Sequence, residues 1–323
     1  MHSIPHRLAE ACRREGCDLV LLSGDLFDGP YTADTLHLVQ NALREMAVPV
    51  FISPGNHDFV GQESPWLRES WPDNVHIFTR PVIESVTLPA LDCCVYGAGY
   101  TGMDCPGLLQ DFSPAHTHRY AICVLHGDPT QSNSPYCPVT APQAAASGVS
   151  YLALGHIHKA GTFRAGKTLC GWPGCPMGHG YDETGEKGYY LVTLDDTAEI
   201  RFVPLDVPRF YDLELPVDTD LAGVLPPVAT EDHYRITLTG AGDPPALSAI
   251  YAAFPHIPNL EVRDHTVPMT DIWGSAGSDS FEGMYFSLLQ QALEGADPEQ
   301  QKRIRLAARI SRQLLDGQEV VLP

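Results

Sequence analysis

The stretch Asp18-Leu-Val-Leu-Leu-Ser-Gly-Asp-Leu-Phe-Asp28 decides the fold. Its short apolar run, residues 19–22, is followed by Ser23, by Gly24 and then by a carboxylate, Asp25. A continuous apolar run of this length, bounded by glycine, is typical of a strand buried on both faces in a parallel sheet. In open α/β sheets, ligands bind at the carboxyl ends of the strands. Asp25 is therefore expected at a ligand-binding edge.

Three further apolar runs are followed by polar residues in the same way. Residues 48–52 precede Gly55-Asn-His-Asp58, residues 120–125 precede His126-Gly-Asp128, and residues 150–154 precede Gly155-His-Ile-His158. An amphipathic helix, residues 32–46, lies between the first two runs, which predicts a βαβ unit with parallel strands and an α/β fold. Four strands that deliver Asp, Asn or His to one edge predict a metal site.

The residue types at this edge suit divalent cations. Asp25 is the natural bridging carboxylate, Asn56 offers an amide oxygen, and ring nitrogens come from His126, His156 and His158. Oxygen and nitrogen ligands without thiolate favour Mn, Fe or Zn over Ca or Mg. Alternate side chains of an extended segment point the same way, so both histidines of Gly-His-Ile-His should reach neighbouring ions.

Two cations about 3.5–4 Å apart hydrolyse phosphate esters by generating hydroxide and by clamping the in-line transition state. His57 follows the predicted ligand Asn56 and is placed to protonate the leaving oxygen as a general acid. Asp58 is expected to orient it.

Composition limits the other classes of function. The 323 residues allow two domains, and nothing resembles a secretory leader or a membrane span. The nine cysteines lack the paired spacing of zinc sites, which favours packing roles for reduced thiols in the cytoplasm. A net charge of −20 argues against binding nucleic acid through a general positive field, although bound cations could still recruit a phosphate ester.

Prolines at 204, 208 and 216 predict a boundary near residue 208. Residues 1–207 would form the α/β domain, and residues 208–323 a smaller α+β domain that closes with two helices. The last helix carries Arg305, Arg309 and Arg312 on one face. That face is either solvated or a docking surface for DNA or a protein partner.

The motifs around Asp25, Asn56, His126 and His156 resemble those of the calcineurin-like metallophosphoesterases. The strings Leu21-Leu-Ser-Gly-Asp-Leu-Phe-Asp28 and Pro173-Gly…Glu183-Thr-Gly-Glu-Lys-Gly188 resemble the DNA-repair exonuclease branch, the SbcD and YhaO type. The resemblance implies a four-layer α/β/β/α sandwich for residues 1–207 and a capping domain for residues 208–323. It also implies two Mn²⁺ ions, DNA as the substrate, a role in double-strand-break repair, an SbcC/YhaN-like ATPase partner with coiled coils, and a homodimer.

The chain departs from this family at its start. The family opens with a strand that carries Asp-x-His, two ligands of one metal, and no such motif precedes Asp25. By the resemblance, one ion would have Asp25, Asn56, His126 and His156, whereas the other would keep only Asp25 and His158. The expectation is an N-terminally incomplete domain, with His2 and His6 as the available replacements.

Asp28 stands where some family members carry an active-site histidine. It would either tune substrate access or cap the following helix. Two other functions stay open. The acidic charge favours a small-molecule phosphodiesterase or phosphatase, and the absent Asp-x-His favours a non-catalytic scaffold.

Overall fold

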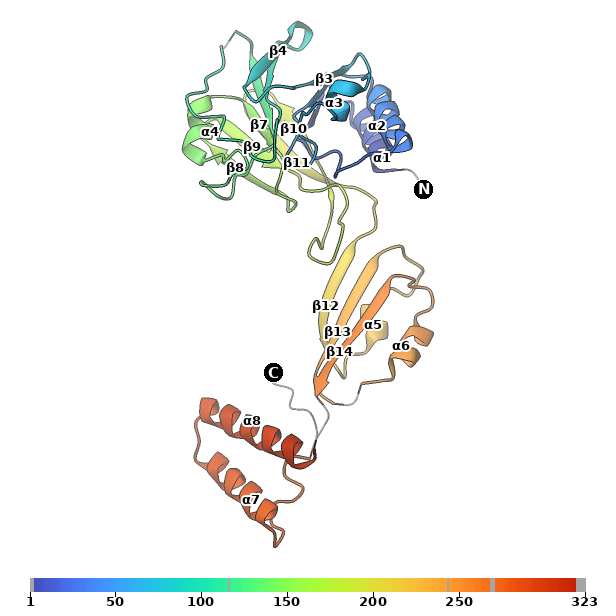
Figure 1. Cartoon of the computed structure of the whole chain (residues 1–323), viewed down its shortest axis with the longest axis vertical. Helices are drawn as coiled ribbons and strands as arrows, with labels where there is room; N and C mark the ends of the chain where they lie inside the picture. Colours follow the sequence, from blue (N-terminus) through green and yellow to red (C-terminus); the bar gives the residue numbers. More distant parts are fainter. Residues whose placement is uncertain (1–2, 116, 243, 268–270, 318–323) are drawn as a thin grey trace. The chain divides into compact units, whose positions relative to one another are not determined.

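The computed structural model describes residues 3–115, 117–242, 244–267 and 271–317. The chain forms two compact units, Met1–Phe210 and Tyr211–Pro323 (Figure 1). The first unit contains every predicted metal ligand.

Two sheets and a hairpin build the first unit. The first sheet is parallel and has the order β1-β2-β3, with β1 at Val20–Leu22, β2 at Val50–Ile52 and β3 at Val75–Ile77. The second has the order β4-β5-β6-β7-β9-β8. Its strands are β4 (Glu84–Leu88), β5 (Cys93–Gly97), β6 (Tyr120–Leu125), β7 (Tyr151–Leu154), β8 (Gly161–Ala165) and β9 (Thr168–Trp172). The antiparallel hairpin consists of β10 (Gly188–Leu194) and β11 (Ala198–Pro204).

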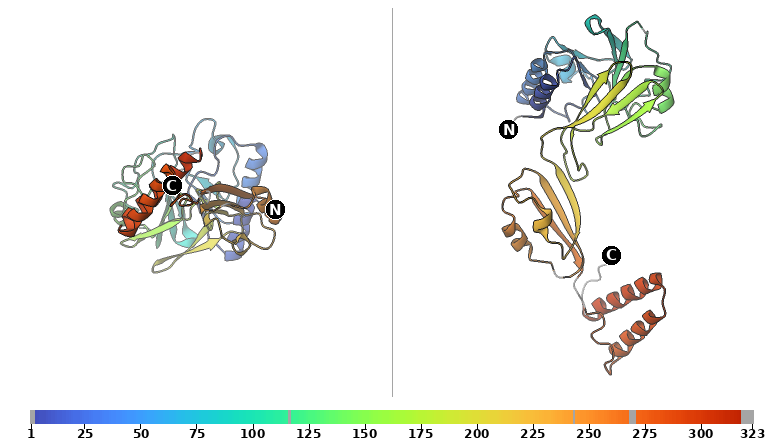
Figure 2. Two further views of the ribbon diagram at one scale, coloured as in Figure 1. Left: turned by 90° about the horizontal axis from the view of Figure 1, so that it is seen from below. Right: turned by 180° about the vertical axis from the view of Figure 1, so that it is seen from behind.

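The alternation of side chains along the strands separates three apolar layers. Cys93 and Val95 face a core that also holds Phe51 of the first sheet, whereas Cys94 and Tyr96 face a second core with helix α4 (Ala141–Ser147). Helices α1 (Ile4–Glu15) and α2 (Ala33–Met46) cover the other face of the first sheet. Figure 2 shows α1 and α2 on one side of the sheets and α4 on the other. The predicted α/β/β/α sandwich is confirmed.

Local turn chemistry fixes the ends of these helices. Gly16 follows α1 with a left-handed φ of 65°, a conformation that glycine adopts without strain. Thr32 is the N-cap of α2, where its side chain accepts a hydrogen bond from the backbone N–H of Thr35. A single turn, α3 (Pro65–Arg68), follows the second strand.

Two strand predictions need correction. Strand β1 is half-buried, not fully buried, because in the described part of the chain it lies at the edge of its sheet and pairs with β2 only. Strands β8 and β9 were not predicted, since β8 is short and its side chains are alternately exposed, without a continuous apolar run.

The second unit contains a three-stranded sheet of order β12-β13-β14, with β12 at Phe210–Pro216, β13 at His233–Ala241 and β14 at Leu260–Val267. A core around Ile236 and Leu238 packs against α6 (Leu247–Ala253), and α5 (Leu221–Val224) is one short turn. The unit closes with α7 (Phe281–Glu294) and α8 (Pro298–Leu315), which contact each other. None of the helices in the described ranges is long and apolar enough to cross a lipid bilayer.

Candidate metal centre

The four strands that carry the predicted ligands belong to two different sheets. Strands β1 and β2 lie in the first sheet, and β6 and β7 lie in the second. One buried serine joins the sheets at their carboxyl ends: the hydroxyl of Ser53 donates to the carbonyl of Ala98 (2.6 Å) and accepts from the backbone N–H of His126 (3.1 Å). The site is therefore held between two sheets and not along one edge.

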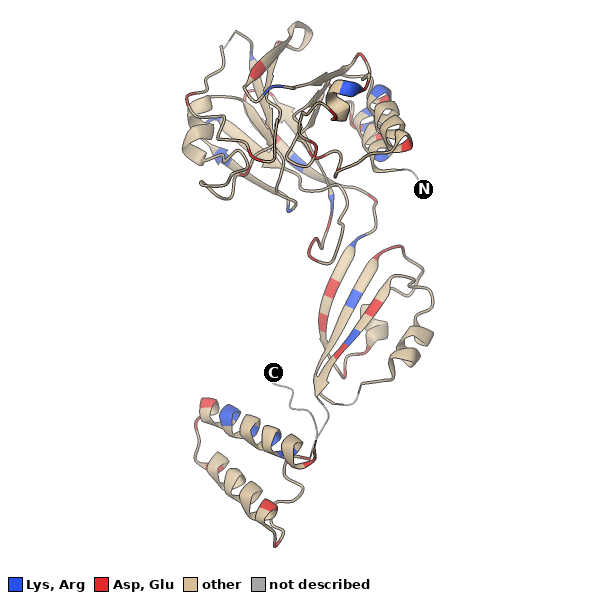
Figure 3. Ribbon diagram, viewed as in Figure 1, with Lys and Arg blue, Asp and Glu red and all other residues tan. Residues whose placement is uncertain are grey.

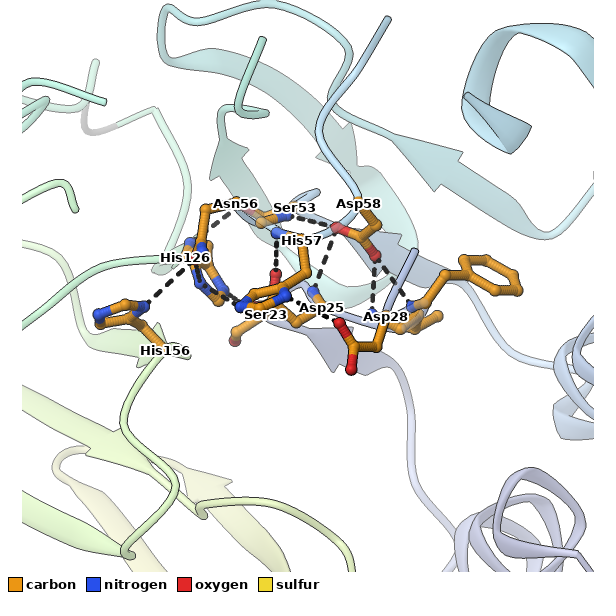
Figure 4. A network of polar contacts seen from close by, with 12 residues as sticks. Ser23, Asp25, Asp28, Ser53, Asn56, His57, Asp58, His126 and His156 are labelled. Carbon is orange, nitrogen blue, oxygen red and sulfur yellow. Dashed lines mark hydrogen bonds and ion pairs between the residues drawn. The ribbon is translucent and has the colours of Figure 1, made fainter. Parts of the chain in front are cut away.

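Four predicted ligand side chains converge at this junction (Figure 4). His126 Nε2 lies 3.3 Å from Asp25 Oδ2 and 2.9 Å from Asn56 Oδ1. His156 Nδ1 lies 3.3 Å from the same Asn56 oxygen. Metal–ligand bonds of about 2.1 Å place neighbouring ligand atoms about 3.0 Å apart in an octahedral site and about 3.4 Å apart in a tetrahedral one. The three distances are close to these values, so the pairs Asp25–His126, Asn56–His126 and Asn56–His156 are spaced like neighbouring ligands of a cation.

The protonation of His126 agrees with this role. Its Nδ1 lies 2.7 Å from the carbonyl oxygen of Ser23, which can only accept, so Nδ1 carries the proton and Nε2 carries the lone pair. A ligating histidine is commonly fixed by such a bond from its other nitrogen. Burial lowers the pKa of His126 and also that of His156. Both imidazoles are thereby kept in the neutral form that binds metal.

Asp58 ties the two ligand loops together. Its carboxylate accepts backbone N–H bonds from Gly55 (2.7 Å) and Leu26 (2.7 Å), and a longer one from Asp25 (3.2 Å). Burial raises the pKa of Asp58 to about 6; the N–H bonds oppose this shift, and the neighbouring Asp25 carboxylate adds to it. The prediction that Asp58 orients His57 is wrong, because both of its oxygens are used by these backbone groups.

The carboxylate that contacts His57 belongs to Asp28. His57 Nδ1 lies 2.9 Å from Asp28 Oδ1, and the backbone N–H of His57 donates to Asp25 Oδ1 (3.0 Å). Asp28 does not cap the following helix, because Thr32 occupies that position. Both side chains are exposed, so the pair lies on the solvent side of the cluster.

Two of the ligands occupy left-handed backbone. The φ of Asp25 is 54° and that of His156 is 75°. Residues other than glycine rarely adopt this left-handed region. Residues in such conformations cost on the order of 1 kcal/mol and are common where a site is preorganised. Gly55 fits against the same cluster, since a Cβ at this position would lie 2.8 Å from the His126 ring.

His158, the fifth predicted ligand, has a different partner. Within the described residues, its Nδ1 contacts the carboxylate of Glu183. The predicted alternation requires extended backbone, and the left-handed φ of His156 breaks it. Of the two proposed replacement ligands, His6 lies on α1 beside Glu10 and Glu45, and His2 lies outside the described residues.

The three arginines of α8 do not form one free face. Arg312 is paired with Glu282 and with Asp316 (2.8 Å), and its guanidinium lies 5.4 Å from the ring centre of Phe286. It therefore joins α8 to α7. Arg305 is exposed and Arg309 is half-buried. Basic residues recur along α8 (Figure 3).

Sequence reasoning missed the residues that support the ligands. Ser23 acts through its backbone carbonyl and Ser53 through a bond between sheets, and neither has a sequence signal. Glu183 lies within a string that resembles the exonuclease branch, but its contact with His158 spans 25 positions and appears only in the folded chain.

Comparisons with known proteins agree with this geometry. Residues 2–160 match the calcineurin-like phosphoesterase family. The protein described as "Uncharacterized metallophosphoesterase YhaO", from Bacillus subtilis (strain 168), is 35% identical over 204 residues, which cover 59% of this chain and 48% of that protein. The chain thus matches about half the length of this relative.

Among solved structures, the crystal structure of TT1561 of Thermus thermophilus is 14% identical, with a TM-score of 0.39, and the match covers 62% of this chain and 92% of that one. This likeness is too low to carry an argument about the site. The family match over residues 2–160 contains Asp25, Asn56, His126 and His156, and the YhaO relative extends it. Residues 2–160 therefore form a calcineurin-like phosphoesterase domain, and the chain is similar to metallophosphoesterases of the YhaO type.

Proposed function

We propose that this phosphoesterase is a metal-dependent DNA exonuclease, the nuclease subunit of a complex that repairs double-strand breaks. One observation carries the hydrolytic part of the proposal: four metal-ligand side chains and the His57–Asp28 pair meet at the carboxyl ends of four strands. The choice of DNA as substrate is supported by the strings at residues 21–28 and 173–188, which resemble the exonuclease branch.

The roles of the residues follow from their contacts. Asp25, Asn56, His126 and His156 would hold the cation, for which we propose Mn²⁺. A bound divalent ion supplies charge neutralisation and a water of lowered pKa. The family's second ion would share Asp25 and use His158.

His57 gives the leaving oxygen its proton. Asp28 accepts from Nδ1 and so fixes the ring, which leaves Nε2 as the atom that donates. Asp58 keeps the loops of Asp25 and Asn56 in register but does not touch the reacting atoms.

The test compares two substrates with the same purified protein in Mn²⁺. We expect hydrolysis of bis-(p-nitrophenyl) phosphate and progressive loss of nucleotides from end-labelled duplex DNA. Asn56→Ala should abolish both activities, and His57→Ala should lower kcat about 10²–10⁴-fold with little change in Mn²⁺ affinity. Asp28→Asn should lower kcat by less than about tenfold, because the exposed pair contributes about 1 kcal/mol or less.

Two outcomes would replace the proposal. Hydrolysis of the chromogenic diester without action on DNA ends would indicate a small-molecule phosphodiesterase, which the net charge of −20 favours. Mn²⁺ binding without either activity would indicate a scaffold.

For the partners, we propose an SbcC/YhaN-like ATPase that docks on the closing helices, together with a homodimer of the catalytic domain. The docking proposal is supported by an apolar stripe on α7, where Phe281, Met284 and Leu288 are spaced three and four residues apart and are 81%, 59% and 64% exposed. Leu288→Glu should abolish co-purification with the ATPase, and Glu294→Lys, at the end of the same helix, is the control. Unchanged co-purification would remove the proposal.

A further inference from the structure

The loop between β9 and β10, residues 173–187, packs against the segment that carries His158. Two of its contacts involve the main chain. The N–H of Cys175 donates to the carbonyl of His158 (3.2 Å). Gly174 has a left-handed φ of 79°, and a Cβ there would collide with the same carbonyl and lie 3.1 Å from the backbone nitrogen of Ala160. The loop therefore rests directly on the backbone of His158.

A third contact joins the loop to the ring of His158. Glu183 Oε1 contacts His158 Nδ1, and the side chain of Glu183 is 13% exposed whereas that of His158 is 53% exposed. An ionised carboxylate can only accept hydrogen bonds, so Nδ1 of a neutral His158 carries the proton. The lone pair of the ring then lies on Nε2, which has no hydrogen-bond partner in the described part of the chain.

The second oxygen of Glu183 is held within its own loop. Oε2 accepts a hydrogen bond from the backbone N–H of His179 (2.8 Å) and lies 3.5 Å from Cys175 Sγ, a thiol that can donate. It also lies 3.4 Å from the ring nitrogen Nδ1 of His179. Rotation of the carboxylate away from His158 would break these contacts. Glu183 therefore holds the ring of His158 in one orientation.

His126, in the four-ligand cluster, is fixed in the same way. Its Nδ1 donates to the carbonyl of Ser23 (2.7 Å), and its Nε2 faces Asn56 Oδ1 (2.9 Å). Histidines that ligate metals commonly donate their other ring N–H to a carbonyl or carboxylate, which fixes the tautomer and makes the ligand more basic. A charged acceptor forms the stronger bond of the two. The contact of Glu183 with His158 is thus the kind that supports a metal ligand.

We propose that Glu183 is a positioning residue of the metal centre. It fixes His158 as the tautomer protonated on Nδ1 and leaves Nε2 for the second ion, so that residues 173–187 belong to the centre. The inference rests on the proposed function in one respect, the use of His158 by that ion. In the rival arrangement, His158 is an imidazolium that pairs with Glu183 and has no lone pair to give.

NMR of the full chain with ¹⁵N-labelled histidine tests the tautomer without metal or substrate, because protonated and unprotonated ring nitrogens differ in chemical shift. At about pH 8, where an unperturbed imidazole is neutral, we expect Nδ1 of His158 to be protonated and Nε2 to be unprotonated. His158→Asn assigns the signals by their absence. In Glu183→Ala, the proton should move mainly to Nε2, whereas Glu183→Gln keeps an acceptor oxygen and should retain the proton on Nδ1.

Titration with Zn²⁺, a diamagnetic probe, follows each ion through its own histidine. Binding shifts the Nε2 signal of the ligand, so His158 reports the second ion and His126 reports the first. Glu183→Ala should raise the Zn²⁺ concentration needed at His158 about 10–100-fold and leave that at His126 unchanged. Asp182→Ala is the matched control, since it removes one negative charge at the preceding, exposed position. It should leave the tautomer of His158 and both titrations unchanged.

Three results would overturn the inference. In the unmodified chain, His158 would carry its proton on Nε2 or carry two protons, or it would not respond to Zn²⁺. Alternatively, Glu183→Ala would respond at the same Zn²⁺ concentration as the unmodified chain. The tests on the unmodified chain require no variant to fold. Failure of the proposed function has a different signature: neither DNA nor the chromogenic diester would be cut, while the tautomer and the Zn²⁺ response of His158 would still support the role of Glu183.

Discussion

Replacing Asp58 by asparagine tests whether its carboxylate holds the two ligand loops together. Oδ1 accepts from the N–H groups of Gly55 and Asp25, and Oδ2 accepts from those of Leu26 and Phe27. The side-chain amide of asparagine keeps only one acceptor oxygen. Its NH₂ group is a donor, and in place of the second oxygen it would face two backbone N–H donors. Whichever way it turns, one bond of 2.7 Å and one longer bond are lost.

The expected cost follows from these losses. A hydrogen bond to a charged acceptor contributes about 1.5–3 kcal/mol, and a buried donor without a partner costs about 1–3 kcal/mol. The asparagine variant also avoids the cost of burying a carboxylate anion, a cost that is visible in the raised pKa of Asp58, about 6. This gain offsets part of the lost stability. We expect Asp58→Asn to lower the free energy of unfolding by about 2–4 kcal/mol, measured by urea denaturation without metal at about pH 8, where the carboxylate is ionised.

Asp28→Asn is the matched control. It makes the same chemical change on the other ligand loop, which follows β1, but the Asp28 side chain is 93% exposed, so the free energy of unfolding should change by less than about 0.5 kcal/mol. The affinity for Mn²⁺ should fall about 10–100-fold in Asp58→Asn, because the ligand loops lose their common support. A loss of stability below about 0.5 kcal/mol together with unchanged Mn²⁺ affinity would refute the role assigned to Asp58.

Three further perturbations test other contacts. Gly55→Ala should abolish tight Mn²⁺ binding, measured by calorimetry, because the new Cβ would lie 2.8 Å from the His126 ring. Gly61→Ala is the control: its Cβ would meet its nearest neighbour at 3.5 Å, so this variant should bind Mn²⁺ normally. Arg312→Ala should speed proteolysis within the α7–α8 pair about tenfold, because opening the pair costs about 1.4 kcal/mol less without the ion pair to Glu282 and the contact with the Phe286 ring. The exposed Arg305→Ala is the control and should not speed proteolysis; equal rates for the two variants would contradict this. Removal of bound metal by a chelator should abolish hydrolysis of the chromogenic diester, and added Mn²⁺ should restore it. Hydrolysis that survives the chelator would argue against a metal-dependent mechanism.

The parts of the fold that sequence predicts well have strong local signals. The last of the two predicted closing helices, α8, runs from Pro298 to Leu315, because Asp297 and Gln300 form a capping box and Pro298 suits the first turn. Strand β12 has a weaker signal: apolar and acidic residues alternate over residues 211–215, but the strand is short and follows a proline-rich segment. Its identity as a strand depends on pairing with β13, which is a tertiary effect.

In the candidate site, residue types were predictable and pairings were not. His57 and Asp58 are neighbours in sequence, but they lie in a bend and contact different groups. Each found its partner about 30 residues away: His57 contacts Asp28, and Asp58 binds the backbone of residues 25–27. The left-handed φ of His156 was also invisible to a pattern argument, and it decides where His158 lies.

The division of the ligands between two sheets has a consequence for the order of folding. The contacts of Asn56 with His126 and His156 span 70 and 100 positions of the chain, so they close only after both sheets have formed and packed. Such long-range contacts are late events, since loop closure must precede them. An ion bound there should slow unfolding in proportion to its affinity and leave the refolding rate nearly unchanged. Metal supply would then set how long a folded molecule lasts, and not how fast a new one is made.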